Sequence, residues 1–221
     1  MSAGTPRRRV AVLISGRGSN MTSLLAATKD PAFPAEISLV LSNRPEAPGL
    51  ATAREHGVNT VAIDHKQHMS REDFERAMQE VLEAHRVELI CLAGFMRILT
   101  PWFVERWTGR MINIHPALLP LYKGLHTHER ALADGVKLHG ASVHFVVPGM
   151  DEGPIIAQAA VPVLDGDTPD TLGQRVLAQE HVIYPLALGL LASGRIAIEG
   201  ARVRVSGEAA QTTALVAPQL A

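Results

Sequence analysis

Short apolar runs alternate with amphipathic stretches through the first half of the chain. Residues 10–15 read VAVLIS, a continuous apolar run of strand length, which is typical of a central parallel strand covered on both faces. Later runs of the same character lie at residues 37–41, 60–63, 88–92 and 111–115. Helical patterns stand between the runs, at residues 21–29, 47–56, 70–85 and from Pro101 onward. This alternation predicts an α/β fold, with a Rossmann-like, mostly parallel twisted sheet and flanking helices.

The pattern changes after residue 120. Residues 128–134 predict a short helix. Residues 139–147 and 155–163 then have the composition of two strands joined by a segment rich in Gly and Pro. We expect these two strands to form a hairpin-like pair, so that antiparallel strands are added to the sheet in the C-terminal half.

A long helical pattern and a small hairpin close the chain. Residues 168–191 are helical in pattern, but Pro185 lies inside them and predicts a break or kink near Tyr184. Residues 195–198 and 202–205 have the composition of two short strands around a Glu-Gly turn.

Composition and charge narrow the class of protein. Of the 221 residues, 47% are hydrophobic and 19% charged, so we expect one globular domain over residues 1–221, with flexible ends at 1–9 and about 206–221. The formal net charge of −1 gives no reason to expect a nucleic acid or a membrane as partner. No signal segment is recognisable and no apolar run reaches the roughly 18 residues of a membrane helix, so we expect a cytoplasmic protein.

The sequence gives little support for a reactive cysteine or for a metal site. Cys91 is the single cysteine, which excludes an internal disulfide framework and a Cys-rich metal site. It lies in the apolar run LICLAG, where we expect a buried structural thiol. The histidines at 126, 128, 139 and 144 offer a metal-binding alternative, but they complete no known ligand spacing, so we expect no metal.

The turn after the first strand is a candidate anion site. Residues 16–20 read GRGSN between a strand and a helix, a layout that points free backbone N–H groups at a ligand. Met21 stands where a dinucleotide fingerprint needs its third glycine, and the Gly-Lys-Ser/Thr of a P-loop is missing. The pattern therefore favours a single phosphate, with the Ser19 and Asn20 side chains assisting the amides. A tight turn without a ligand is the alternative.

Two polar residues leave the strand at 111–115 together. Asn113 and His115 are two apart and point to the same side, at the strand end where α/β sheets bind ligands. Pro116 restricts His115 to an extended conformation and stops the strand. Asp151 lies in a Gly- and Pro-rich loop, where packing gives no reason for a carboxylate. The three groups together can stabilise an oxyanion and accept protons during acyl transfer, while a hydrogen-bonded structural role for the histidine is the alternative.

Motifs along the chain carry a resemblance to a known family. They are ISGRGSN (14–20), AGFMRIL (93–99), NIHPALLP (113–120), GLHTHERAL (124–132), HGASVHFV (139–146), DEGPII (151–156) and QEHVIYP (179–185). Over about residues 9–200 the chain resembles the phosphoribosylglycinamide formyltransferases of the folate-dependent formyltransferase superfamily. The resemblance implies transfer of the formyl group of 10-formyltetrahydrofolate to the amine of N1-(5-phospho-D-ribosyl)glycinamide in de novo purine biosynthesis. The products would be the N-formyl compound and tetrahydrofolate.

The resemblance also implies catalytic roles. Asn113 and a protonated His115 would stabilise the oxyanion on the formyl group, because two fixed donors in a dry cleft need no metal. Asp151 would raise the pKa of His115 and relay a proton through water. His144 is expected to support this cluster or to lie near the phosphate, with a structural role as the alternative.

Two binding regions follow from the same resemblance. Gly18, Ser19 and Asn20 would hold the ribonucleotide phosphate, and Glu180 the glycinamide amine. The folate would contact a larger set, mostly through backbone groups: Arg71, Met96, Arg97, Ile98, Leu99, Asn113, Val147, Pro148, Gly149, Met150 and Asp151. Residues 10–115 would then form a ribonucleotide-binding half of the domain, and residues 116–205 a folate-binding and catalytic half.

Other functions within and outside the superfamily stay open at this point. A formyltetrahydrofolate hydrolase is expected to carry an extra N-terminal regulatory domain, and a methionyl-tRNA formyltransferase a basic C-terminal domain. Intact Asn113, His115 and Asp151 argue against an inactive folate- or phosphate-binding module. The family often has Ser where Ala117 stands and Lys where Leu121 stands, which bears on substrate affinity. We expect an enzyme with small-molecule substrates that acts as a monomer or homodimer.

Overall fold

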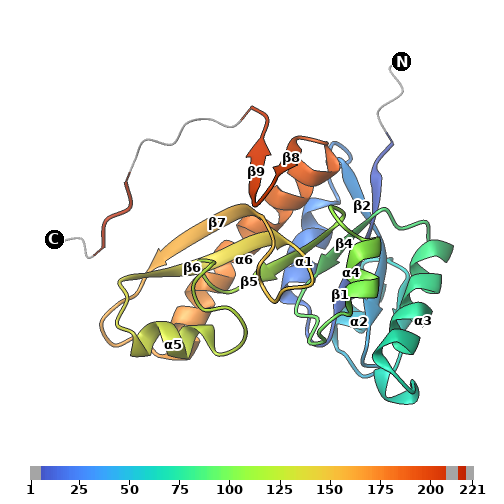
Figure 1. The fold of residues 1–221 in the computed structure, drawn as a ribbon, viewed down its shortest axis with the longest axis horizontal. Coiled ribbons are helices and arrows are strands. Elements are labelled where there is room, and N and C mark those ends of the chain that lie inside the picture. The colour runs from blue at the N-terminus through green and yellow to red at the C-terminus, as the bar shows by residue number, and fades with distance from the viewer. Residues whose placement is uncertain (1–5, 208–213, 218–221) are drawn as a thin grey trace.

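A mixed sheet of seven strands runs through the molecule (Figure 1). The computed structural model describes residues 6–207 and 214–217. The strand order is β3-β2-β1-β4-β5-β6-β7. The bounds are β1 Arg8–Ile14, β2 Ala35–Ser42, β3 Thr60–Ala62, β4 Leu89–Leu92, β5 Met111–His115, β6 Leu138–Phe145 and β7 Ile155–Pro162. Neighbouring strands from β3 to β5 pair parallel, whereas β6 pairs antiparallel with β5 and β7. The predicted sheet is confirmed.

Helices cover both faces of this sheet (Figure 1). One face carries α1 (Ser19–Ala27), α2 (Gly49–Glu55) and α6 (Pro169–Ala192), and the other carries α3 (Arg71–Ala84) and α4 (Pro101–Arg106). A short α5 (Thr127–Ala133) lies against α6, and η1 (His65–Gln67) follows β3. Ser70 caps α3, because its hydroxyl accepts the backbone N–H of Asp73. The hairpin of β8 (Ile196–Glu199) and β9 (Arg202–Val205) also matches its prediction.

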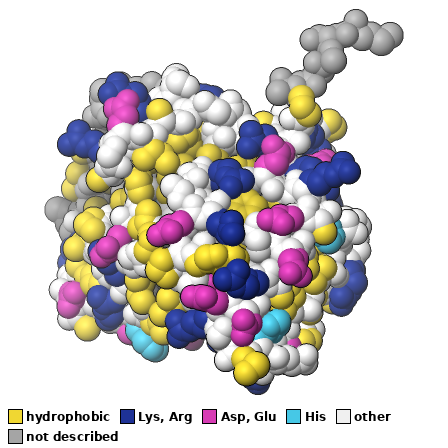
Figure 2. Space-filling view, turned by 45° about the vertical axis from the view of Figure 1, so that its right-hand side comes forward, with side chains coloured by type: hydrophobic (Ala, Val, Ile, Leu, Met, Phe, Trp, Pro, Cys, Tyr) yellow, Lys and Arg dark blue, Asp and Glu magenta, His cyan; other side chains and the backbone are white. Residues whose placement is uncertain are grey.

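Charged side chains of both signs are interspersed over the face shown in Figure 2. This mixture agrees with the formal net charge of −1. Within the described residues, no helix is long and apolar enough to cross a membrane.

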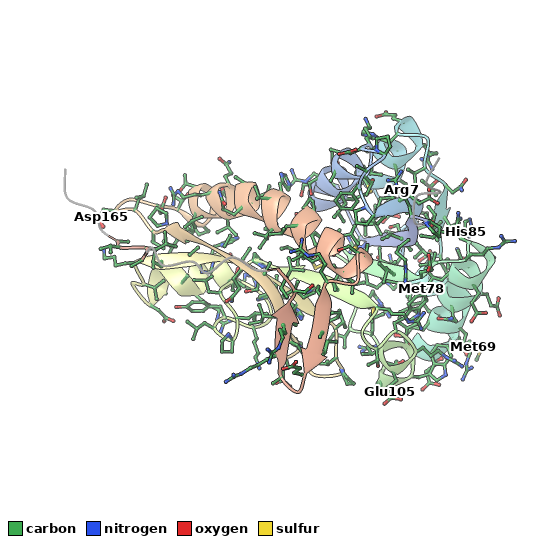
Figure 3. The ribbon with its side chains drawn as sticks, turned by 90° about the horizontal axis from the view of Figure 1, so that it is seen from above. Arg7, Met69, Met78, His85, Glu105 and Asp165 are labelled. Carbon is green, nitrogen blue, oxygen red and sulfur yellow. The ribbon has the colours of Figure 1, made fainter. Side chains whose placement is uncertain are left out.

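The N-terminal arginines are part of the fold, so the prediction of a flexible start is wrong for residues 7–9. Arg8 and Arg9 belong to β1, and the guanidinium of Arg7 donates hydrogen bonds to the carbonyl oxygens of Thr28 and Ala35 (Figure 3). Side-chain hydrogen bonds to backbone groups distant in sequence thus hold a segment that was expected to be flexible. Residues 1–5 lie outside the described part, as do residues 208–213 and 218–221 of the predicted flexible tail.

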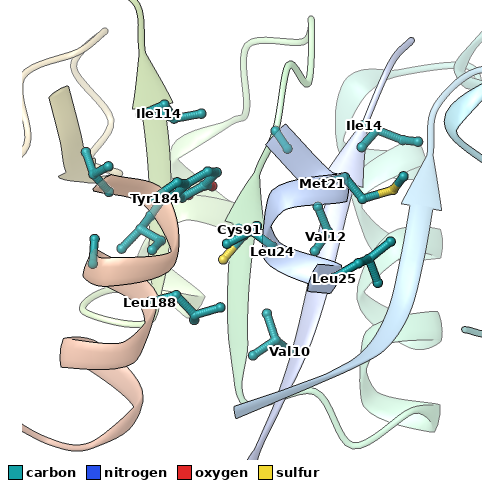
Figure 4. Packing of buried hydrophobic residues seen from close by; sticks show 14 of the residues in the cluster. Val10, Val12, Ile14, Met21, Leu24, Leu25, Cys91, Ile114, Tyr184 and Leu188 are labelled. Carbon is teal, nitrogen blue, oxygen red and sulfur yellow. The ribbon is translucent and has the colours of Figure 1, made fainter. Parts of the chain in front are cut away.

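Two apolar clusters, one on each face, form the core. Val10, Val12 and Ile14 of β1 point to the α1 and α6 side, whereas the residues between them point to α3 and α4. On the first side, Tyr184 of α6 lies near Cys91 of β4 (Figure 4). Cys91 is fully buried, and burial raises the pKa of its thiol to about 12, as a structural role requires.

The long helix is not broken near Tyr184, because α6 continues through Pro185 as one element, and the alternative of a kink there stays a prediction. Proline has no N–H to donate to the carbonyl one turn earlier, which usually weakens a helix. Here Ile183 and Tyr184 before the proline, and Ala187 and Leu188 after it, are all buried in the same cluster. Burial on both sides of Pro185 stabilises the helix across the missing hydrogen bond.

Candidate active site

The amide of Asn113 is oriented by the neighbouring strand. Asn113 and His115 lie on β5, and Asn113 faces His144 of β6 in the strand register. Asn113 Nδ2 lies 3.2 Å from His144 Nε2. His144 Nδ1 lies 2.8 Å from the carbonyl oxygen of Phe145, which can only accept a hydrogen bond. His144 Nε2 thus lies within reach of both the Asn113 amide and the Asp151 carboxylate, and these contacts hold the amide beside His115.

Asp151 connects the two histidines. Its Oδ2 lies 3.4 Å from Nδ1 of His115, and its Oδ1 lies 3.6 Å from Nε2 of His144. Oδ2 also accepts the backbone N–H of Gly124 at 2.9 Å. The backbone of Asp151 has a φ of 52°, in the left-handed region that aspartate adopts more readily than most residues. This conformation turns one carboxylate oxygen toward each imidazole.

Burial governs the protonation of His115. The residue is only 5% exposed, and its Nε2 donates to the carbonyl oxygen of Tyr122 at 2.9 Å. Burial lowers the pKa of His115, and this effect outweighs the Tyr122 carbonyl and the charge of Asp151, which raise it. Asp151 thus raises the pKa of His115 as predicted, but burial makes the net shift downward, so the expected overall increase is not found. Burial alone raises the pKa of Asp151, but its contacts with His144, Gly124 and His115 bring it below the ordinary value.

These groups lie in the wall of a cavity of about 580 Å³. Its lining comes from both halves of the chain: residues 92 and 94–99 after β4, the end of β5, residues 124–129, and residues 144 and 146–151. Several large apolar side chains are exposed in the lining: Met96, Ile98, Leu125 and Met150 are between 54% and 70% exposed. A cavity of this size with apolar walls and a few fixed polar groups is typical of a small-molecule site.

A second polar cluster lies at the start of α1. Gly18 precedes the helix with a φ of 74°, which glycine adopts without strain, and Ser19 begins the helix. Asn20 Nδ2 donates to Glu180 Oε2 of α6 at 2.7 Å. Glu180 is 6% exposed, and burial raises the pKa of its carboxyl, only partly offset by the Asn20 hydrogen bond. Among the described residues, buried Asn20 Oδ1 has no hydrogen-bond partner.

The turn before α1 and the cavity lie at the same edge of the sheet. The backbone N–H of Ser15 donates to the carbonyl oxygen of Gly94, which lines the cavity. On the far side of the strands, the Tyr184 hydroxyl donates to the carbonyl oxygen of Leu92 at 2.8 Å, one helical turn after Glu180. Glu180 therefore lies next to the ends of the strands that carry the cavity, although it does not line the cavity itself.

The histidines considered for a metal are dispersed. His128 Nδ1 lies 3.1 Å from His139 Nε2, and His144 belongs to the Asp151 cluster. In residues 6–207 and 214–217, no group of three or more His, Cys, Asp or Glu side chains is placed to hold a metal ion.

Known proteins share this sequence and this fold. The formyl transferase family matches residues 8–188. Phosphoribosylglycinamide formyltransferase of Escherichia coli (strain K12) is 45% identical over 187 residues, which cover 85% of this chain and 88% of the relative. The crystal structure of glycinamide ribonucleotide transformylase 1 from Symbiobacterium toebii has a TM-score of 0.88 at 45% identity, over 92% of this chain and 99% of that chain. The chain belongs to the phosphoribosylglycinamide formyltransferases.

Longer relatives contain this formyltransferase sequence as one part. The trifunctional purine biosynthetic protein adenosine-3 of Homo sapiens is 49% identical over 190 residues, which are 86% of this chain but 19% of the relative. The chain spans about a fifth or less of such trifunctional relatives.

The structure brings most of the predicted site residues of this formyltransferase together. Asn113, His115, Asp151 and His144 form one connected cluster. The predicted folate contacts line the cavity around that cluster: Met96, Arg97, Ile98, Leu99, Val147, Pro148, Gly149 and Met150. Arg71 is the exception, since it is the exposed first residue of α3 and is not part of the lining.

The sequence did not reveal the contacts of residues 122–129, which lie beside the Asp151 cluster and lead into α5. Tyr122 supplies the carbonyl oxygen for His115, Gly124 supplies an N–H for Asp151, and residues 125–129 line the cavity. The GLHTH motif lies in this formyltransferase segment, so its composition gave a signal. The contacts themselves are made by backbone groups, which side-chain types do not reveal.

Proposed function

We propose that the protein transfers the formyl group of 10-formyltetrahydrofolate to the amine of N1-(5-phospho-D-ribosyl)glycinamide. The observation that carries the proposal is the cluster of Asn113, His115 and Asp151 in the wall of the cavity. Formyl transfer to an amine requires groups that stabilise charge on the formyl oxygen and a group that accepts a proton from the amine. The amide, the imidazole and the carboxylate of this cluster supply these groups in one cavity.

The cavity suits a reduced folate. Backbone N–H groups of Arg97, Ile98 and Leu99 donate to no acceptor among the described residues, so they are free to bind the polar edge of a heterocycle. The apolar side chains around them suit the faces of a flat ring system. The folate supplies the formyl carbon when it is bound, and the protein supplies shape and hydrogen bonds.

The cluster at α1 suits the other substrate. At the N-terminus of α1, the backbone N–H groups of Gly18 and Ser19 donate to no acceptor in the described part of the chain, so they are available for a phosphate. Asn20 Oδ1 and the Glu180 carboxyl are buried acceptors that suit a primary amine, and an amine would satisfy the unpartnered Asn20 oxygen. The phosphate and the amine would then lie at the edge of the sheet where the cavity opens.

Asn113, His115 and Asp151 each have a separate role in the proposed reaction. Asn113 donates to the formyl oxygen as negative charge develops there, since its amide is already fixed by His144. His115, when protonated, places a positive charge beside the same oxygen, and Asp151 stabilises that imidazolium from 3.4 Å. Asp151 also accepts the proton that the attacking amine must lose and returns it to the departing folate nitrogen as the bond from that nitrogen to the formyl carbon breaks, directly or through water.

Product analysis with the purified protein tests the proposal and separates its rivals. The expected result is an N-formyl ribonucleotide and tetrahydrofolate in equal amounts when both substrates are present. Formate released from 10-formyltetrahydrofolate without the amine would instead indicate a hydrolase. Binding of both substrates with no product would indicate an inactive binding module.

A further inference from the structure

One wall of the cavity comes from the segment 95–100, whose backbone N–H groups make few hydrogen bonds to described residues. β4 ends at Leu92 and α4 begins at Pro101, and residues 95–99 between them line the cavity. Among the described residues, the backbone of 95–100 donates two hydrogen bonds to the protein, one from Met96 and one from Thr100. Both acceptors are side chains from other elements. A loop of this kind keeps one conformation only if those side chains hold it.

Glu75 of α3 holds the C-terminal end of the segment. Its Oε1 accepts the backbone N–H of Thr100 at 2.7 Å, and its Oε2 accepts the Thr100 hydroxyl. Thr100 precedes α4, yet its hydroxyl does not cap that helix and is committed to Glu75 instead. Glu75 is 1% exposed, and a carboxylate is buried at a large desolvation cost unless hydrogen bonds compensate it. All of its hydrogen bonds to described residues go to Thr100.

Ser15 holds the N-terminal end. Its hydroxyl oxygen accepts the backbone N–H of Met96 at 2.8 Å, and the same hydroxyl donates to Asn43 Oδ1 at 2.6 Å. Ser15 and Asn43 are 4% and 1% exposed, so neither bond competes with solvent. Asn43 is fixed in turn by its contact with His65 at 3.2 Å.

We infer that Glu75 and Ser15 are positioning residues that set the folate-side wall of the cavity by fixing Met96 and Thr100. The inference rests on the proposed function, because it assigns residues 96–99 to the bound folate. Glu75 and Ser15 do not line the cavity, so they act through the backbone that does. Fixing both ends of the segment places the free N–H groups of Arg97, Ile98 and Leu99 for the ligand before it binds, which favours binding.

Substitution of Glu75 tests the inference against a purely structural role. Glu75→Ala removes both contacts to Thr100, and we expect the KM for 10-formyltetrahydrofolate to rise about 10-fold or more, the scale of a lost charge-assisted hydrogen bond. We expect the KM for the ribonucleotide to change by less than about two-fold, since the α1 site is separate. In Glu75→Gln the amide oxygen still accepts the Thr100 N–H, so the KM should be intermediate. Glu80→Gln, an exposed glutamate on the same helix, is the matched control.

Hydrogen exchange provides a measurement that does not depend on turnover. We expect faster exchange in peptides covering residues 94–100 of Glu75→Ala without substrate, and unchanged exchange in Glu80→Gln. Ser15→Ala should have the same effect from the other end. If Glu75→Ala does not fold, Thr100→Val removes only the hydroxyl contact and serves in its place.

The possible outcomes are distinct. A lower kcat or melting temperature with unchanged folate KM and unchanged exchange would overturn the positioning role and leave Glu75 as part of the scaffold. Absence of formyl transfer by the wild type would overturn the proposed function. In that case, faster exchange in the variants together with weaker equilibrium binding of tetrahydrofolate would still support the two positioning residues.

Discussion

The charge of Asp151 is expected to account for much of the catalytic rate. Asp151→Asn keeps the size of the side chain and an oxygen that can accept the Gly124 N–H, but it removes the negative charge beside His115. At 3.4 Å and an effective dielectric constant of about 20, that charge stabilises an imidazolium by at most about 5 kcal/mol. Fixed transition-state donors are worth about 2.7–4 kcal/mol when measured. We therefore expect kcat to fall by at least ~100-fold.

The assay follows formation of tetrahydrofolate with both substrates saturating, so that the change is read in kcat. The KM of each substrate should change little, because Asp151 acts mainly after binding. Asp165→Asn is the matched control: the same chemical change at a side chain that is fully exposed, where an ion pair contributes little. Equal melting temperatures of the variants and the wild type would show that the fold is intact.

An NMR titration of His115 tests the effect of the Asp151 charge separately from the shape of the site. Burial lowers the pKa of His115 even with Asp151 present, so the variant should lower it further. In NMR titrations the His115 imidazole of Asp151→Asn should therefore protonate at lower pH than in the wild type. Wild-type kcat in Asp151→Asn, or an unchanged His115 titration, would refute the proposed role of the carboxylate.

Further predictions concern the other polar groups. His115→Ala should lower kcat by at least ~100-fold with the fold retained, and near-normal turnover would remove His115 from the mechanism. Glu180→Gln should raise the KM for the ribonucleotide by about 10-fold and leave the folate KM unchanged, and a shift of the folate KM instead would contradict the assignment. Burial lowers the pKa of His139 from 6.5 to about 4, so the unfolded chain binds more protons between these values and the free energy of unfolding should fall as the pH drops through this range. Urea unfolding should show a slope of up to about 1.4 kcal/mol per pH unit from this residue, reduced in His139→Gln, and an equal slope in the variant would contradict this attribution.

The fold was predictable because its local signals agree with its tertiary contacts. The run at residues 10–15 is apolar at every strand position because β1 is buried on both faces, so composition and environment match. Predictions failed where a contact distant in sequence overrides a local rule. Pro185 remains inside α6 because residues on both sides of it are buried, and Arg7 is ordered by carbonyl oxygens 21 and 28 residues away.

The side chains of the candidate site could be proposed from the sequence, but their electrostatics could not. Asn113, His115 and Asp151 were recognisable from residue type, spacing and resemblance. The lowered pKa of His115 was not, because it depends on how completely the fold excludes water from one imidazole. The contacts of Tyr122 and Gly124 were also missed, since a carbonyl and an N–H are present in nearly every residue and carry no sequence signal.

The lowered pKa of His115 bears on when the proposed imidazolium forms. If Asp151 held His115 protonated at all times, the charged pair would be present before the substrates bind. Burial instead favours neutral His115, while both of its nitrogens face oxygen acceptors, Tyr122 O at 2.9 Å and Asp151 Oδ2 at 3.4 Å. A second negative charge in the cavity, added to that of Asp151, favours the imidazolium further because it offsets the cost of burying that cation. In the proposed reaction, the charge that develops on the formyl oxygen during attack would be such a charge, so the stabilisation by His115 would be largest in the transition state, where it would accelerate the reaction.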